Sequence, residues 1–131
     1  MCIRDSSAVE ELLRFESPLQ LNNRLTTEPM TIGDTTIPAG TFLTLGVGAA
    51  NRDPDQFGQA EHLDIGRSPN NHLAFGQGRH ACSGMNVARL EGRIAFAAVA
   101  RRFPSIDLSG PPERDPRIRF RGFRHLPVVI N

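Results

Sequence analysis

The sequence predicts a mainly α-helical fold with a small β-sheet portion, on the strength of three observations. Apolar residues recur at helical spacing over residues 7–16 and again over residues 85–103. Between them, residues 19–45 form short β-type runs separated by glycine and proline. The 131 residues suffice for one domain. The predicted order is a helix, β-hairpins, a meandering coil, a cysteine loop, a long helix and a terminal hairpin.

The first predicted helix, SAVEELLRFE at residues 7–16, begins at a capping Ser6 or Ser7 and ends before Pro18. The runs LQLNNRLTT, MTIG, TTIPAG and TFLTLGVGAA then predict a small sheet of hairpins. Residues 51–74 show no sustained period and predict a long ordered coil. The second helix covers residues 85–103, and the tail offers two strand candidates, IRFRGF at 118–123 and LPVVI at 126–130.

The composition excludes several classes of protein. A net charge of +1 gives no general attraction to nucleic acid or to an anionic membrane, and no apolar run is long enough to span a bilayer. The two cysteines, Cys2 and Cys82, form no disulfide framework and indicate a reducing cytoplasm. The opening MCIRDS matches a translated sequencing adapter, so we expect residues 1–6 to be non-native and residues 7–131 to be a fragment of one larger domain.

A single cysteine stands in the glycine-rich turn FGQGRHACSG, residues 75–84, directly before the second helix. Exposed N–H groups at a helix start favour a thiolate there, and Arg79 and His80 add positive charge. Glycines let the backbone approach a bulky partner. From the residues alone, Cys82 can be a nucleophile, a redox centre, a metal ligand or a small buried apolar side chain.

Two motifs distinguish these alternatives. The turn fits the pattern F-G-x-G-x-H-x-C-x-G at each of its fixed places, and it resembles the haem-ligand loop of the cytochromes P450. Glu11-Leu12-Leu13-Arg14, which begins 71 residues upstream of the cysteine, is similar to that family's E-x-x-R helix motif. The resemblance covers residues 7–131 and implies the C-terminal part of the cytochrome P450 fold.

The resemblance implies roles for individual residues in binding haem b. Cys82 would be the axial thiolate ligand of the iron, and hence the metal-binding and catalytic residue. Phe75 would pack near the sulfur, and Gly76 and Gly84 would let the loop approach the macrocycle. The haem propionates would be bound by His80 and Arg24. His72 is expected to be structural, with a haem contact as the weaker alternative.

The resemblance also implies a buried structural network and a substrate-contact region. Glu11 and Arg14 would form an acid–base pair with Arg67 as the third member, while His62 occupies the place of an arginine found in many eukaryotic relatives. Two residues depart from the usual loop, Ser83 in place of leucine and Met85 in place of a smaller residue. The substrate would be contacted by Leu19, Gln20, Leu21, Asn22 and Phe123.

These roles imply a haem-thiolate monooxygenase that inserts one atom of O2 into a small organic substrate. Electrons from NAD(P)H would arrive through a ferredoxin or flavodoxin-type donor on the Cys-loop side, where Arg79, Arg89 and Arg93 are either docking residues or a solvated surface. The isolated fragment is expected to be inactive, and no nucleic acid, membrane or oligomer is implied.

Three alternatives remain open at this level. One is a haem-thiolate peroxygenase, isomerase or dehydratase, which the family's acid–alcohol helix would discriminate if it were present in the sequence. Another is a non-catalytic haem-binding or redox-sensing module built on Cys82. The third is a phosphate-binding loop, which the absence of a third glycine and of a strand–helix unit disfavours.

Overall fold

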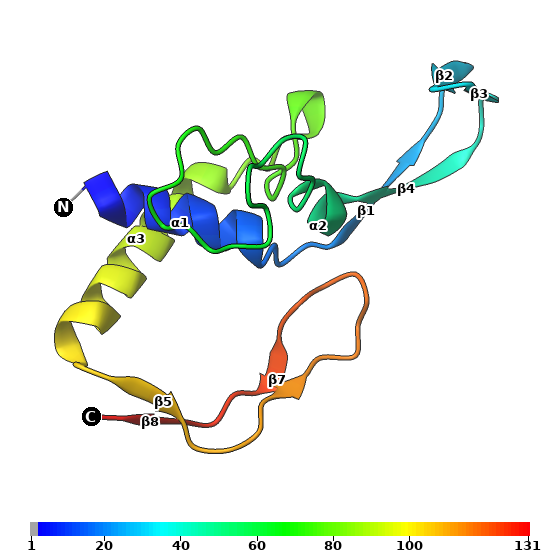
Figure 1. The fold of residues 1–131 in the computed structure, drawn as a ribbon. Helices are drawn as coiled ribbons and strands as arrows, with labels where there is room; N and C mark the ends of the chain where they lie inside the picture. The colour runs from blue at the N-terminus through cyan, green and yellow to red at the C-terminus, as the bar shows by residue number, and fades with distance from the viewer. Residues whose placement is uncertain (1–2) are drawn as a thin grey trace.

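The computed structural model describes residues 3–131. The expectation that residues 1–6 are an adapter remnant therefore lies partly outside the described residues. Three helices and a series of small antiparallel sheets follow one another along the described chain (Figure 1). None of the described helices is long and apolar enough to cross a membrane.

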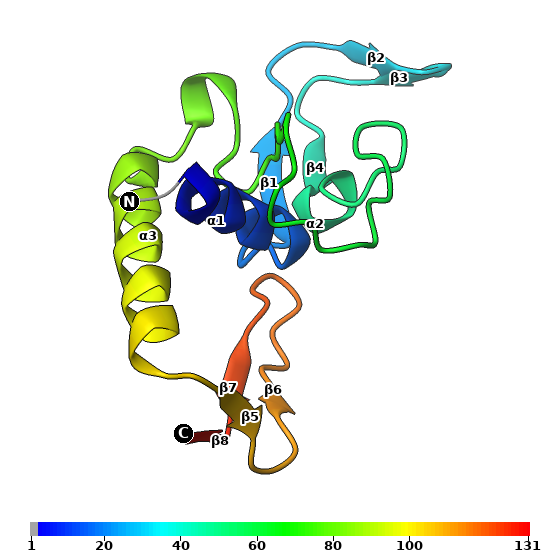
Figure 2. The same ribbon diagram turned by 60° about the vertical axis from the view of Figure 1, so that its left-hand side comes forward.

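Helices α1 (Ile3–Phe15) and α3 (Met85–Arg102) pack against each other, although they lie far apart in the sequence (Figure 2). The contact buries Val9, which is 3% exposed, against Gly92 of α3. The prediction of α3 is confirmed to within one residue. The predicted cap of α1 is wrong, because the helix begins at Ile3 and the Ser7 hydroxyl instead donates to the Ile65 carbonyl (2.7 Å).

Two small antiparallel sheets lie between these helices in sequence. Strand β1 (Leu21–Leu25) pairs with β4 (Phe42–Gly46), and β2 (Met30–Ile32) forms a tight hairpin with β3 (Thr35–Ile37). These four strands confirm the predicted hairpins. The β2–β3 hairpin stands away from the helices in both views (Figures 1 and 2).

The end of the last predicted β-run is helical. Helix α2 (Val47–Ala50) directly follows β4, and the Asn51 amide donates to the Val47 carbonyl (3.0 Å). Two alanines favour a helical turn here, and the buried Val47 anchors it. The predicted coil is confirmed, because no helix or strand occurs from residue 51 until the 3-10 turn Gly78–His80. This coil lies beside α1, as the green trace in Figure 1 shows.

The C-terminal part contains an antiparallel hairpin that includes Phe123, but the two predicted strand candidates do not pair with each other. Strand β5 (Ile106–Leu108) pairs with β8 (Val128–Ile130), while β6 (Glu113–Arg114) pairs with β7 (Phe123–His125). Pro127, which has no N–H to donate, lies between β7 and β8, and these two strands belong to different pairs. Most of the first strand candidate is a loop, which touches the rest of the chain through a bridge between Phe120 and Leu19.

The helical share is smaller than predicted, and the buried core is polar. Within residues 3–131 the α-helices contribute 13, 4 and 18 residues, so most of the described chain is strand, turn and coil. The largest fully buried side chains are charged or polar, namely Arg14, Glu11, Asn51 and Ser17. Large apolar side chains on α3 are exposed instead, among them Val87, Leu90, Ile94 and Phe96. A hydrogen-bonded network therefore occupies the centre of this chain.

The close approach of α1 and α3 makes Gly92 sensitive to substitution. A Cβ atom at position 92 would lie 3.1 Å from Val9 Cγ1. We expect Gly92→Val to lower the free energy of unfolding by about 1–3 kcal/mol, as overpacking does. Chemical denaturation measures this loss. Glu91→Val, at an exposed site on the same helix, is the control, and equal effects of the two substitutions would contradict the prediction.

Candidate functional site

The cysteine loop is a tight turn whose shape depends on two glycines. Gly76 and Gly78 adopt φ values of +70° and +69°, a region that other residues rarely occupy. The Cys82 amide donates to the Phe75 carbonyl (2.8 Å) and closes the loop. A Cβ atom at position 76 would also lie 3.3 Å from the His80 carbonyl. The loop therefore presents Cys82 as an exposed, free thiol directly before α3.

A cavity of about 530 Å³ lies between this loop and the β1–β4 sheet. Arg24 reaches it from β1 and His80 reaches it from the cysteine loop, so the two predicted propionate-binding residues share one cavity. Neither forms an ion pair with any residue in the described part of the chain. Apolar side chains cover part of its wall, namely Leu45, Val47, Ala50 and Leu73.

This donor set fits a haem group. A flat apolar macrocycle needs apolar wall, its two carboxylates need cations, and its iron needs an axial ligand. The cavity offers the wall and two N–H-bearing side chains without acidic partners, those of Arg24 and His80, and the loop that contributes His80 also carries the exposed Cys82 thiol. The thiol itself does not line the cavity. No cluster of three or more potential metal-ligating side chains occurs among residues 3–131.

The Glu11–Arg14 pair is fully buried between α1 and the coil. Arg14 Nε and Nη2 donate to the two Glu11 carboxylate oxygens, each over 2.8 Å. The remaining Arg14 N–H groups donate to three backbone carbonyls of the coil, those of Asn51, Ala60 and His62, over 2.8–3.1 Å. Each of the five donors of the guanidinium thus has an acceptor. His62 contributes through its backbone carbonyl.

Arg67 joins the same carboxylate. Its Nε lies 3.0 and 3.1 Å from the two Glu11 oxygens, and its Nη1 donates to the Gly58 carbonyl (2.9 Å). The Asp64 amide and the Asn70 side-chain amide complete the set of donors to Glu11. Burial by itself would raise the pKa of Glu11, but the hydrogen bonds from Arg14, the Asp64 amide and Arg67 lower it to about 2. Glu11 is therefore ionised across the neutral pH range.

Asn51 connects this network to the cysteine loop, a link that the sequence did not reveal. Its side-chain amide donates to the Ser17 hydroxyl (2.6 Å) at the end of α1. Its side-chain carbonyl accepts the Leu73 amide (2.7 Å), two residues before Phe75. Asn51 is 0% exposed. Nothing in the sequence marks this asparagine, because its partners lie 34 and 22 residues away.

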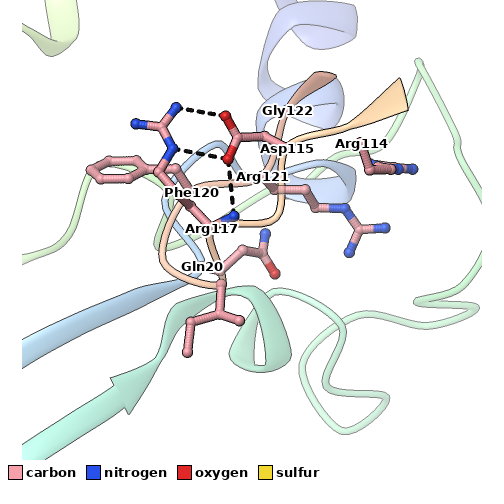
Figure 3. Close-up of a pocket in the computed structure, with 8 residues that line it drawn as sticks. Gln20, Arg114, Asp115, Arg117, Phe120, Arg121 and Gly122 are labelled. Carbon is pink, nitrogen blue, oxygen red and sulfur yellow. Dashed lines mark hydrogen bonds and ion pairs between the residues drawn. The ribbon is translucent and has the colours of Figure 1, made fainter. Parts of the chain in front are cut away.

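Two of the five predicted substrate residues line these cavities, and they line different ones. Asn22 lines the cavity that holds Arg24, whereas Gln20 lines a separate pocket of about 350 Å³ (Figure 3). Leu19 forms an antiparallel backbone bridge with Phe120. The sequence did not identify Phe120 as its neighbour. Phe123 lines neither space, and the Arg114 guanidinium lies 4.4 Å from its ring centroid.

The pocket in Figure 3 is rich in arginine, but each of its three arginines already lies beside a carboxylate. Arg117 donates to both oxygens of Asp115 (2.9 and 2.8 Å). Arg121 and, at 3.7 Å, Arg114 pair with Glu16 at the end of α1. These guanidinium groups therefore hold the C-terminal loop in place. They contrast with Arg24 and His80, which have no acidic partner in the described chain.

Comparison with known proteins agrees with this geometry. A sequence profile of the family Cytochrome P450 matches residues 6–125. The chain belongs to the cytochrome P450 family. Family membership implies haem as the cofactor.

Its relatives are bacterial cytochromes P450. The chain is 44% identical over 130 residues to the polyketide biosynthesis cytochrome P450 PksS of Bacillus subtilis, covering 96% of this chain and 32% of that protein. It is 46% identical over 125 residues to the biotin biosynthesis cytochrome P450 of the same organism, covering 95% and 32%. The crystal structure of P450BioI with an acyl carrier protein carrying hexadec-9Z-enoic acid superposes with a TM-score of 0.93 at 43% identity, covering 98% of this chain and 34% of that chain. The chain thus spans about a third of the length of these P450 relatives.

The low pKa of Glu11 predicts a loss of stability in acid. The ordinary pKa of a glutamate is 4.5, and the pKa of Glu11 in the folded protein is about 2. Such a group stabilises the fold fully above pH 4.5, and this contribution is lost as the pH falls through 2. We expect the loss to amount to about 3 kcal/mol. Denaturation from pH 2 to 6 should show a flatter pH dependence for Glu11→Gln than for the wild type.

The control for this experiment is Glu28→Gln, since Glu28 is exposed and has no hydrogen bond to a described residue. It should keep the wild-type pH dependence. Parallel curves for Glu11→Gln and the wild type would show that Glu11 is not the group responsible.

Proposed function

We propose that this chain is the haem-binding, C-terminal third of a haem-thiolate monooxygenase that works in the cytoplasm on a small organic substrate. The observation that carries the proposal is the cavity that Arg24 reaches from β1 and His80 reaches from the loop presenting the Cys82 thiol, both without acidic partners in the described chain. The likeness to bacterial cytochromes P450 supports it. When bound, haem b supplies the activation of O2 and the insertion of one oxygen atom into the substrate.

In this proposal Cys82 ligates the iron as a thiolate. The loop leaves its sulfur exposed, and Gly84 lies beside it: a Cβ atom at position 84 would be 3.9 Å from Sγ, an ordinary van der Waals distance. The loop-closing hydrogen bond from the Cys82 amide to the Phe75 carbonyl fixes where the sulfur stands. Arg24 and His80 bind the propionates, and Arg24 suits this role because its planar fork bonds a carboxylate through two N–H groups.

The buried Glu11–Arg14–Arg67 network holds the loop rather than the cofactor. It fixes the coil to α1, in part because Arg14 donates to the Asn51 carbonyl. The Asn51 side chain in turn accepts the amide of Leu73 at the base of the loop. The substrate would lie near residues 19–22 and the facing loop at Phe120, where the two segments are joined by backbone hydrogen bonds. The proposed contact at Phe123 is the least supported, because its ring packs under Arg114.

Electrons from NAD(P)H would arrive through a ferredoxin or flavodoxin-type protein at the cysteine-loop face. Arg79 is exposed there and forms no ion pair with a described residue, so it suits an acidic partner. Arg89 does not suit this role, because Glu10 holds it through two hydrogen bonds. Docking would therefore depend on Arg79 more than on Arg89.

The test of the ligand is a carbon monoxide difference spectrum of the parent protein. We expect the wild type to show the red-shifted Soret band of a thiolate-ligated haem, and Cys82→Ser to lose it because an alcohol is a much poorer donor to iron. A red-shifted band that survives in Cys82→Ser would exclude this residue as the ligand.

The test of the propionate site is the affinity for haem. Arg24→Gln removes one charge-assisted pair, worth about 1.5–3 kcal/mol, so we expect affinity to fall about 10- to 100-fold. His80→Gln should weaken binding in the same direction. Arg124→Gln, at an exposed arginine outside the cavity, serves as the control. Unchanged haem affinity in both Arg24→Gln and His80→Gln would place the propionates elsewhere.

A further inference from the structure

We propose that Glu10, His72 and Arg89 form a positioning cluster that clamps Phe75 and, through it, holds Cys82 in place for haem ligation. This inference rests on the proposed function. The three residues come from α1, the coil and α3, and the E-x-x-R pair uses none of them. We name the group the Phe75 clamp.

The first part of the clamp is an ion pair between the two long helices. Arg89 Nε and Nη2 donate to the two oxygens of Glu10 over 2.7 and 2.9 Å, a bidentate geometry. The side chains are 31% and 25% exposed. Arg89 lies seven residues after Cys82 on α3, and Glu10 lies directly before Glu11 on α1. The pair therefore fixes the first turns of α3 against the E-x-x-R helix.

The second part is His72, whose side chain is only 1% exposed. Its Nδ1 accepts the Ala74 amide (3.1 Å), so Nε2 carries the proton and donates to Glu10 Oε2 (3.1 Å). Burial lowers the pKa of His72 despite the opposing effect of the nearby Glu10 carboxylate, which favours this neutral form. Both hydrogen-bonding atoms of the ring are thus used within the protein. This arrangement agrees with a structural role for His72 and leaves no ring nitrogen to bind haem.

Both partners of Glu10 then meet at the Phe75 ring. The Arg89 guanidinium carbon lies 4.9 Å from the ring centroid, as in a cation–π contact. The His72 ring is tilted by 49° to the Phe75 ring, and their centroids are 6.0 Å apart. The backbone carbonyl of the same phenylalanine accepts the Cys82 amide. A displacement of Phe75 would therefore move the hydrogen bond that sets the sulfur.

The alternative role for these residues is general stability, and its expected size is small. Partly exposed ion pairs contribute about 0–1 kcal/mol to folding. Groups that orient a metal ligand, in contrast, change metal affinity about 10- to 100-fold when they are substituted. The clamp joins three separate segments at the one aromatic residue that is hydrogen-bonded to Cys82 in the described chain. Its main effect should therefore be on haem retention rather than on the stability of the fold.

The experiment measures the rate of haem transfer from the haem-loaded parent protein to excess apomyoglobin, alongside the unfolding temperature. We expect Arg89→Gln and Glu10→Gln to release haem about 10- to 100-fold faster than the wild type. Arg89→Lys keeps the charge but loses the bidentate fork, so its rate of haem release should lie between those of the wild type and Arg89→Gln. It also replaces Arg89→Gln in the test if that variant does not fold. Arg101→Gln, at an exposed arginine on the same helix, should release haem at the wild-type rate.

A double-mutant cycle tests the path through Phe75. If Arg89 acts through this ring, combining Arg89→Gln with Phe75→Leu should release haem no faster than Phe75→Leu alone. Fully additive effects would overturn the inference. So would equal release rates in Arg89→Gln and Arg101→Gln.

The wild-type spectrum separates this inference from the proposed function. A thiolate-type band that depends on Cys82, together with unaltered haem release in the clamp variants, would overturn the clamp alone. A wild-type protein with no such band would overturn both.

Discussion

The structure depends on one buried guanidinium. Arg14 is 1% exposed, and its donors are shared between the Glu11 carboxylate and three carbonyls of a coil that contains no helix or strand of its own. A coil of this kind buries few apolar side chains, so its conformation must be fixed by hydrogen bonds. Removing one partner would leave the other charge buried and unpaired, which costs about 3–5 kcal/mol. The E-x-x-R pair is in this sense the internal support of the coil.

The same support extends to the site. From α1, one set of contacts runs through Asn51 to Leu73 at the base of the cysteine loop. Another runs from Glu10 to Arg89 and Phe75. The adjacent acids Glu10 and Glu11 thus hold the coil, the loop and α3 from a single helix. Their proximity explains how a chain with so few buried apolar residues can position a cavity wall and a thiol together.

The sequence predicted the local elements and the motif residues, but not the contacts between distant segments. Helical periodicity located α3, and Gly-Asp at residues 33–34 located the β2–β3 turn, because these signals act over a few residues. The pairing of β5 with β8 and the role of Asn51 depend on partners 20 or more residues away, for which a single chain carries no local signal. The resemblance to the family did identify Glu11, Arg14 and Arg67, whose side chains meet in the structure. It did not reveal that Arg89 is held by Glu10.

The joint between residues 18–20 and 119–121 consists of backbone hydrogen bonds, from the Gln20 amide to the Arg119 carbonyl and from the Arg121 amide to the Pro18 carbonyl. Hydrogen bonds between main-chain groups do not depend on which side chains the two segments carry. The residues proposed to meet the substrate can therefore be exchanged while the joint persists, and the salt-bridged interior is left untouched. Such a separation would let a single haem-holding scaffold acquire new substrates through small numbers of substitutions.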